Sequence, residues 1–278
     1  MVVQLEALSK LLNDDDPETV RLVKEQLANL AEHNPSALES LISGDDAVVS
    51  YHARDVLSHR DDCEAEDDFT LHCHFAGEGF DIEQAIWALA RVVEPGRGTE
   101  EFEQVINAWG REFLSRVACA TSNAERVEIL SRFLSDELNF RGNSDRYYCQ
   151  NNSVLSRVIE SRMGIPITLT LIYQIIGARG GMKIEGINLP GHFIARHGEV
   201  YFDPFHGGRI LCRCDVKSIL DRQRIEFKES HLKPATSRQF LLRILANLLY
   251  VYDLDGENEK RHRIKCWMDA LSAGSMVK

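Results

Sequence analysis

The chain has 278 residues, enough for two compact domains, and 44% of them are hydrophobic and 27% charged, as in an ordinary globular protein. Its formal net charge is −11, which argues against nonspecific binding to nucleic acid. No apolar run approaches the roughly 20 residues that a membrane-spanning helix needs, and no basic flank precedes an apolar segment at the N-terminus. We therefore expect a cytoplasmic protein that does not act at a membrane.

The seven cysteines are odd in number and scattered, which favours free thiols over a disulfide framework. Only Cys63 and the sequence His72-Cys73-His74 have the composition of a metal site. On a strand, however, His72 and His74 would share one face and Cys73 would point to the other. No second cysteine pair supports a zinc site. The sequence therefore predicts neither a metal site nor a cofactor.

The first half of the chain has the apolar period of helices. Residues 15–30 and 45–59 resemble each other at an offset of 30 residues, and such self-similarity is typical of stacked helix pairs of the HEAT type. The acidic run at 61–68 predicts a flexible loop. Further amphipathic segments follow, so we expect an all-α, HEAT-like domain over residues 1–139, with no catalytic cluster in it.

The composition changes after residue 139. A polar loop that contains Cys149 leads into a short helix, whose predicted N-cap is Asn152 or Ser153. A second, strongly apolar helix follows over residues 167–179 and ends at a pair of glycines. These two helices precede the segments of the chain that alternate as strands do.

Strands are predicted at 182–189 and at 209–216, where apolar and charged residues alternate, with a β-hairpin between them. The order of helices followed by strands predicts an α+β core over residues 140–232, with helices on one face of an antiparallel sheet. Residues 233–278 read as two antiparallel helices, similar to a single tetratricopeptide unit.

The hairpin, residues 186–208, has the sequence GINLPGHFIARHGEVYFDPFHGG. If Arg196 pairs with Glu199 across a tight turn, His192 faces Asp203 directly, with their Cβ atoms roughly 5 Å apart. A carboxylate at this distance orients an imidazole, as in a nucleophile–His–Asp constellation. A structural ion pair at a sheet edge has the same pattern.

Three stretches of the sequence resemble the transglutaminase-like superfamily, and within it the SirB-type bacterial branch: NNSVLSRVIESRMGIPITLTLIY, the hairpin 186–208, and RILANLLYVY. The resemblance covers roughly residues 140–255. It implies a papain-like α+β core, preceded by a helical segment and followed by tetratricopeptide-like helices. Members of the superfamily use a Cys–His–Asp triad, in which the Cys begins a buried helix and the His and Asp lie on neighbouring strands.

By this resemblance the triad's His and Asp correspond to His192 and Asp203. Thr168 takes the expected position of the Cys, since no cysteine lies between Cys149 and Cys212. A threonine hydroxyl needs far stronger activation than a thiol. Four further residues are candidates for contacts with a ligand or partner: Asn152, Ser153, Tyr173 and Phe193.

Three hypotheses follow. In the first, the protein is a non-catalytic transglutaminase-like module that recognises a protein partner of unknown identity, with His192 and Asp203 as the remnant of the site. In the second, Cys149 folds in beside His192 and gives a cysteine-dependent hydrolase or acyltransferase. In the third, the hydroxyl of Thr168 or Ser153 is the nucleophile, although capping and core packing also explain both residues.

Overall fold

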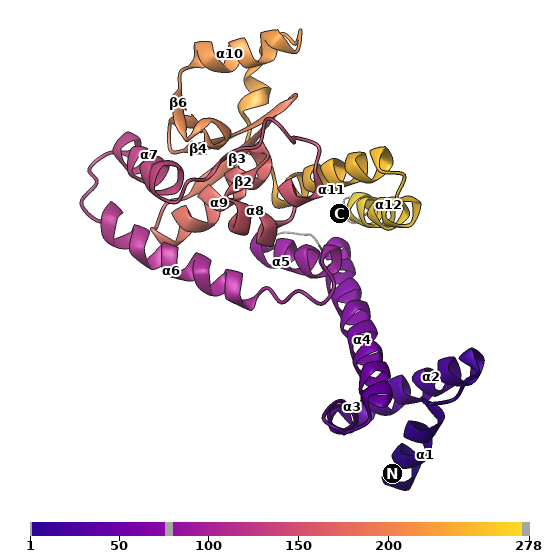
Figure 1. Cartoon of the computed structure of the whole chain (residues 1–278). Coiled ribbons are helices and arrows are strands. Elements are labelled where there is room, and N and C mark those ends of the chain that lie inside the picture. Colours follow the sequence, from indigo (N-terminus) through magenta and orange to yellow (C-terminus); the bar gives the residue numbers. More distant parts are fainter. Residues whose placement is uncertain (1, 76–79, 274–278) are drawn as a thin grey trace. The chain divides into compact units, whose positions relative to one another are not determined.

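A computed structural model describes residues 2–75 and 80–273 (Figure 1). The chain divides into two compact units, one made of residues 1–68 with 94–97 and the other of residues 69–93 with 98–278. The domain boundary predicted at residue 139 does not coincide with this division, because residues 98–139 belong to the second unit.

The first unit is entirely helical. Its helices are α1 (Val2–Leu11), α2 (Pro17–His33), α3 (Pro35–Ile42) and the first part of α4 (Ala47–His74). Asp16 caps α2 by accepting hydrogen bonds from the backbone N–H groups of Glu18 and Thr19, and Pro17 occupies the first helical position. The core of this unit consists of small and branched apolar side chains: Leu12, Val23, Leu27, Ala31, Leu38, Val49, Ala53 and Val56.

The prediction of a flexible loop at 61–68 is wrong, because α4 continues without a break through this acidic run. No glycine or proline lies between Ala47 and His74. The acidic side chains are exposed or half-buried on the helix surface, where Arg60 reaches Glu64 at 3.4 Å, one turn away. His72, Cys73 and His74 consequently lie in a helical turn and not on a strand, with Cys73 buried.

The second unit is built around one buried helix, α9 (Pro166–Arg179). Residues on every side of α9 are buried, because the helix contacts β3 and β4 of the sheet as well as α6 (Glu100–Val117). Arg179, at its C-terminal end, donates to Glu83 at 2.8 Å and to Asn107 at 2.9 Å. A helix that is apolar all round is typical of the centre of a core.

The sheet is a four-stranded antiparallel meander in the order β3-β4-β5-β6. Its strands are β3 (Ile184–Leu189), β4 (His192–His197), β5 (Val200–Asp203) and β6 (Arg209–Leu211).

Other helical elements of the unit are α5 (Ile82–Val93), α7 (Asn123–Ser131), the π-helix η1 (Arg132–Glu137) and α8 (Leu155–Ser161). A two-stranded pairing joins β1 (Arg141–Gly142) to β2 (Met163–Gly164). The predicted α+β class with an antiparallel sheet is confirmed.

The strand predicted at 209–216 is wrong beyond its first three residues. After β6 the chain turns into α10 (Arg213–Arg222). Asp215 accepts the backbone N–H of Cys212 at 2.8 Å, so a helix cap replaces the predicted alternation. Cys212 and Cys214 form a disulfide, which also corrects the expectation that all seven cysteines are free thiols.

The two helices predicted at the end of the chain are present as α11 (Ser237–Leu254) and α12 (Asn258–Ala273). Trp267 of α12 packs edge-on against Phe69, with ring centroids 4.9 Å apart, and donates its indole N–H to Thr70 Oγ1 at 3.0 Å. None of the described helices is both long and apolar enough to cross a lipid bilayer.

Replacing Thr236 with alanine is expected to destabilise the protein by about 1 kcal/mol, because Thr236 is the N-cap of α11. Its Oγ1 accepts the N–H of Gln239 at 3.2 Å, and Gln239 Oε1 accepts the N–H of Thr236 at 3.0 Å. The free energy of unfolding from urea titration measures the loss. Thr236→Ser keeps the acceptor and should stay within a few tenths of a kcal/mol of the parent; equal loss in both variants would contradict the capping role.

Candidate functional site

The predicted hairpin is formed by β4 and β5, but its register differs from the prediction by two residues. His197 pairs with Val200, and Arg196 faces Tyr201 rather than Glu199. The turn is therefore Gly198-Glu199, with φ of +57° at Gly198. Glycine at the first turn position is the requirement of a type II′ hairpin, and this selects Gly198 for that position.

The contact predicted between His192 and Asp203 is nevertheless present, with Nε2 of the histidine 2.8 Å from Oδ2 of the carboxylate. A shift of two residues keeps every side chain on the same face of the sheet, so the pair becomes diagonal instead of directly opposite. The prediction of direct cross-strand pairing is wrong, whereas the pairing of the two groups is right.

A second histidine, missed in the sequence, also binds this carboxylate. His206 Nδ1 lies 2.7 Å from the same Asp203 Oδ2, and the backbone N–H of Phe205 donates to Oδ1 at 3.0 Å. Pro204 starts a short 3-10 turn after Asp203, and residues three apart in such a turn lie on one side. The sequence Asp203-Pro204-Phe205-His206 could have predicted this contact, because its histidine follows the aspartate by three residues across a proline.

The carboxylate at the centre of this cluster is ionised although it is almost fully buried. Asp203 is 2% exposed. Burial opposes its ionisation, but the hydrogen bonds from His192 and then His206 outweigh this, so that the pKa of Asp203 lies below its ordinary value. An ionised carboxylate only accepts hydrogen bonds, so His192 donates from Nε2 and His206 from Nδ1.

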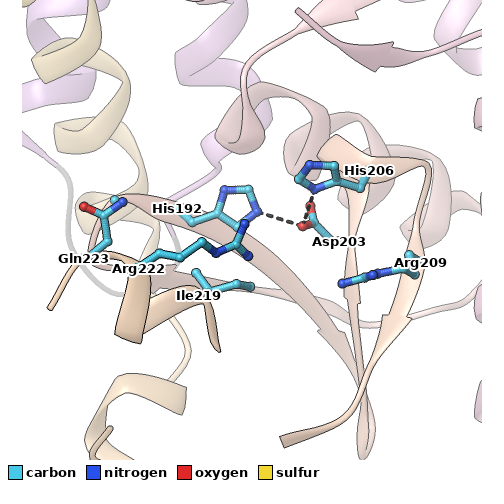
Figure 2. A pocket seen from close by; sticks show the side chains of 8 residues that line it. His192, Asp203, His206, Arg209, Ile219, Arg222 and Gln223 are labelled. Carbon is cyan, nitrogen blue, oxygen red and sulfur yellow. Dashed lines mark hydrogen bonds and ion pairs between the residues drawn. The ribbon is translucent and has the colours of Figure 1, made fainter. Parts of the chain in front are cut away.

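The cluster opens on a cavity of about 350 Å³ (Figure 2). The cavity wall carries several hydrogen-bond donors and one apolar side chain: Gly191, His192, Asp203, His206, Arg209, Ile219, Arg222 and Gln223. Arg209 lies 3.6 Å from Asp215. Arg222, at the end of α10, points toward His192 in Figure 2. Because both histidines bind Asp203, the other polar side chains of this wall are the donors Arg209, Arg222 and Gln223.

At the start of α9, the Thr168 hydroxyl is committed to the backbone. It donates to the carbonyl of Asn152 at 2.7 Å and accepts the N–H of Ile165 at 3.1 Å, and the residue is 1% exposed. The α9 residues that line a small cavity together with His192 are Pro166 and Ile167. Neither of these side chains carries a nucleophilic atom.

Cys149 lies in the turn before η2 (Gln150–Asn152) and is half-buried. Among the hydrogen bonds of the described residues, none joins its thiol to His192. In the described part of the chain, the hydrogen-bond partners of the His–Asp pair are therefore other groups and not this second candidate nucleophile.

Asn152 and Ser153 do not cap α8, whose N-cap is Val154, so the predicted caps are wrong. The Asn152 side chain is instead buried within the preceding loop. Its Nδ2 donates to the carbonyls of Arg146 and Tyr147 at 2.6 and 2.9 Å. The Asn152 side chain therefore orders the loop, because it gives two backbone carbonyls a hydrogen-bond donor. Ser153 is also buried, at 2% exposure.

The remaining candidate residues, Tyr173 and Phe193, are core side chains with less than 2% exposure. Tyr173 Oη lies 2.9 Å from Ser135 Oγ, and burial raises the pKa of Tyr173 to about 12. Phe193 packs against Phe240 with ring centroids 4.9 Å apart. Neither side chain lines the 350 Å³ cavity, and their role in binding stays a prediction.

A buried helix packed on an antiparallel sheet, with a His–Asp pair on neighbouring strands, defines an α+β protein with a His192-Asp203-His206 group beside a cavity. The family profile of the transglutaminase-like superfamily matches residues 100–246, which is more than half of the chain. The chain belongs to the transglutaminase-like superfamily.

Three proteins that are similar to parts of the chain can be compared with it. It is 31% identical over 177 residues to a UPF0162 protein of Xylella fastidiosa, covering 59% of this chain and 62% of that protein. It is 26% identical to the UPF0162 protein PA3419 of Pseudomonas aeruginosa, covering 63% and 66%. Human F-box only protein 21 shares 36% identity over 97 residues, 31% of this chain and 15% of that protein. The chain thus matches less than two thirds of the length of these relatives. No solved structure matches it.

Proposed function

We propose that this is a non-catalytic member of the superfamily, of the SirB-type branch, which recognises a protein partner in a regulatory role. The observation that carries the proposal is the chemistry at the start of α9. There, the side chains next to His192 belong to Pro166 and Ile167, whereas the superfamily's triad needs a thiol at the start of this helix. A carboxylate-oriented histidine without a nucleophile has nothing to activate for acyl transfer.

The two hydroxyl candidates support the same proposal. The Thr168 hydroxyl makes two hydrogen bonds to the backbone at 2.7 and 3.1 Å, and losing them in a buried place would cost about 1–3 kcal/mol. Ser153 is 2% exposed at the end of a 3-10 turn. A buried hydroxyl that is hydrogen-bonded to the backbone, as that of Thr168 is, acts as a structural group.

The partner-recognition part of the proposal is supported by the donor-rich cavity beside the remnant pair. Arg209, Arg222 and Gln223 line the wall of the 350 Å³ cavity, and convergent donors of this kind fix the orientation of a bound polar group. Recognition through this wall needs no covalent step, so the loss of the nucleophile leaves it intact.

The alternative, catalysis by Cys149, is tested by thiol alkylation. We expect the rate of iodoacetamide modification of Cys149, followed against pH by mass spectrometry of the peptide, to be the same in the parent chain and in His192→Ala. A thiol that is not coupled to the imidazole does not sense its removal. Exposed Cys266 serves as the internal reference thiol.

Catalysis itself is tested with ester, thioester and amide substrates. The parent chain is expected to turn these over no faster than His192→Ala does. Turnover that His192→Ala abolishes, together with a change in Cys149 reactivity in that variant, would overturn the proposal and establish the cysteine enzyme.

A further inference from the structure

Three metal-ligand atoms converge at the edge of the cavity. His192 Nε2, Asp203 Oδ2 and His206 Nδ1 all lie within 4.8 Å of one another. They come from β4, from the end of β5 and from the turn that follows it, so the sheet and the 3-10 turn fix their relative positions. Figure 2 shows both imidazoles directed at the one carboxylate, above the wall formed by Ile219 and Arg222.

We propose that these three atoms form one face of an octahedral binding site for a divalent first-row transition-metal ion, such as Mn²⁺, Fe²⁺ or Co²⁺. Two imidazoles and one carboxylate on one face, with the opposite positions open, are the ligand set that such ions take in non-haem sites. This inference goes beyond the proposed function and does not depend on it, because it concerns binding of an ion and not the absence of a nucleophile.

The distances within the cluster show that the three groups are bonded to one another and must separate to take an ion. With bonds of about 2.1 Å, neighbouring ligands of an octahedral ion are about 3.0 Å apart, and those of a tetrahedral ion about 3.4 Å. Asp203 Oδ2 lies 2.8 Å from His192 Nε2 and 2.7 Å from His206 Nδ1. The three ligand atoms lie within 4.8 Å of one another. The imidazoles and the carboxylate must therefore turn out of their mutual hydrogen bonds to leave room for an ion about 2.1 Å from each ligand atom.

Binding of an ion requires a change in the proton positions of the two histidines. In the hydrogen-bonded cluster, the nitrogen of each ring that faces Asp203 carries a proton. Moving that proton to the other ring nitrogen exposes a lone pair to the ion at His192 Nε2 and at His206 Nδ1. The Phe205 N–H remains on Oδ1 at 3.0 Å and holds the carboxylate in place while Oδ2 binds.

The cavity supplies room for the other coordination positions. Water molecules fit in its volume of about 350 Å³. Arg209 and Arg222 in the same wall are cations that oppose a bare metal ion, and an anionic co-ligand such as a carboxylate offsets this repulsion by lying between the ion and the guanidinium groups.

The test uses the full chain, stripped with chelator, desalted without reductant and titrated with Co²⁺ by calorimetry and by visible absorption. We expect a single saturable ion per chain, with the weak absorption of a five- or six-coordinate ion. His206→Ala should weaken binding at least tenfold. Its melting temperature should fall by only a few degrees, because His206 is 60% exposed, and this keeps the loss of binding separate from loss of fold.

Two control variants locate the ion. His262→Ala removes an exposed histidine near Cys266 on α12 and should leave Co²⁺ affinity within about twofold of the parent. The double variant Cys212→Ser/Cys214→Ser removes the two sulfur atoms beside Asp215, which form a disulfide in this structure and could bind an ion only if reduced. It should also bind normally. The proposal is overturned if the parent binds no ion, if His206→Ala binds like the parent, or if binding is lost with the cysteines instead. None of these results bears on catalysis at Cys149.

Discussion

Replacing Gly208 with alanine is expected to lower the free energy of unfolding by about 3 kcal/mol. Gly208 has a φ of +73°, a conformation that costs an L-residue roughly 1–2 kcal/mol. Its added Cβ would lie 2.5 Å from Ser131 Cβ and 2.9 Å from Tyr173 Oη. Both neighbours are buried, so the site relieves the overlap only by moving packed atoms, at a further cost of about 1–3 kcal/mol.

The neighbouring glycine gives a matched control. Gly207 has a φ of +71°, but a Cβ built there meets nothing closer than Ser135 Oγ at 3.7 Å. Gly207→Ala therefore incurs the conformational cost alone, about 1 kcal/mol. Urea unfolding of both variants measures the difference. Equal destabilisation would show that the close approach of β6 to α7 does not constrain this turn.

Replacing Asp203 with asparagine is expected to destabilise the protein by about 3 kcal/mol at neutral pH. The carboxylate is 2% exposed and accepts from His192, His206 and the Phe205 N–H. Asparagine keeps one acceptor but turns an N–H₂ toward a donor, so a buried charge-assisted network is left with unmatched groups. Chemical denaturation at pH 7 gives the loss directly.

The same substitution should change how stability depends on pH. The pKa of Asp203 is lower in the folded protein than its ordinary value, so its ionised form adds stability above the unfolded-state pKa of about 3.9. This contribution is lost as the pH falls through the still lower folded-state pKa. We therefore expect the stability gap between the parent and Asp203→Asn to narrow below about pH 4. A gap independent of pH would mean that the charge of Asp203 contributes nothing.

His206→Ala provides the control for the network. It removes one of three donors to Asp203 while the exposed imidazole takes little packing with it. We expect a loss of about 1.5 kcal/mol, the lower end of the range for a hydrogen bond to a charged group, because the imidazole is exposed. If His206→Ala lowered the free energy of unfolding as much as Asp203→Asn does, the hydrogen bond from His206, and not the one from His192, would be the main stabilising interaction of Asp203.

The contact between His192 and Asp203 could be predicted because alternation along a strand has a period of two, so a register error of two residues still leaves both groups on one face. The register itself depends on which residue of the turn takes a positive φ, and His197-Gly198 and Gly198-Glu199 are both acceptable from composition. His206 was not found, because its place on the carboxylate depends on the turn that Pro204 starts.

Three other predictions of local structure were wrong, because the contacts that determine helix, strand or loop at those places cannot be read from the local sequence. Acidic residues at 61–68 are typical of a loop, but in α4 they lie in an unbroken helix without a glycine or proline. The alternation around Cys212 is typical of a strand, yet a four-residue Cys-x-x-Asp cap starts α10 there. The predicted N-cap residue Asn152 found backbone partners in a loop instead.

The strand order β3-β4-β5-β6 has a consequence for the kinetics of folding. Every strand pairs with its neighbour in the chain, across the two-residue turns Pro190-Gly191 and Gly198-Glu199 and the turn after Asp203. Closing such short loops costs little chain entropy, and contacts between residues close in sequence form fastest. All strand-to-strand pairings of the ladder that carries His192 and Asp203 lie within residues 184–211, so its register is set by local turns, while the apolar face of the sheet is completed later by residues such as Leu232 and Phe240.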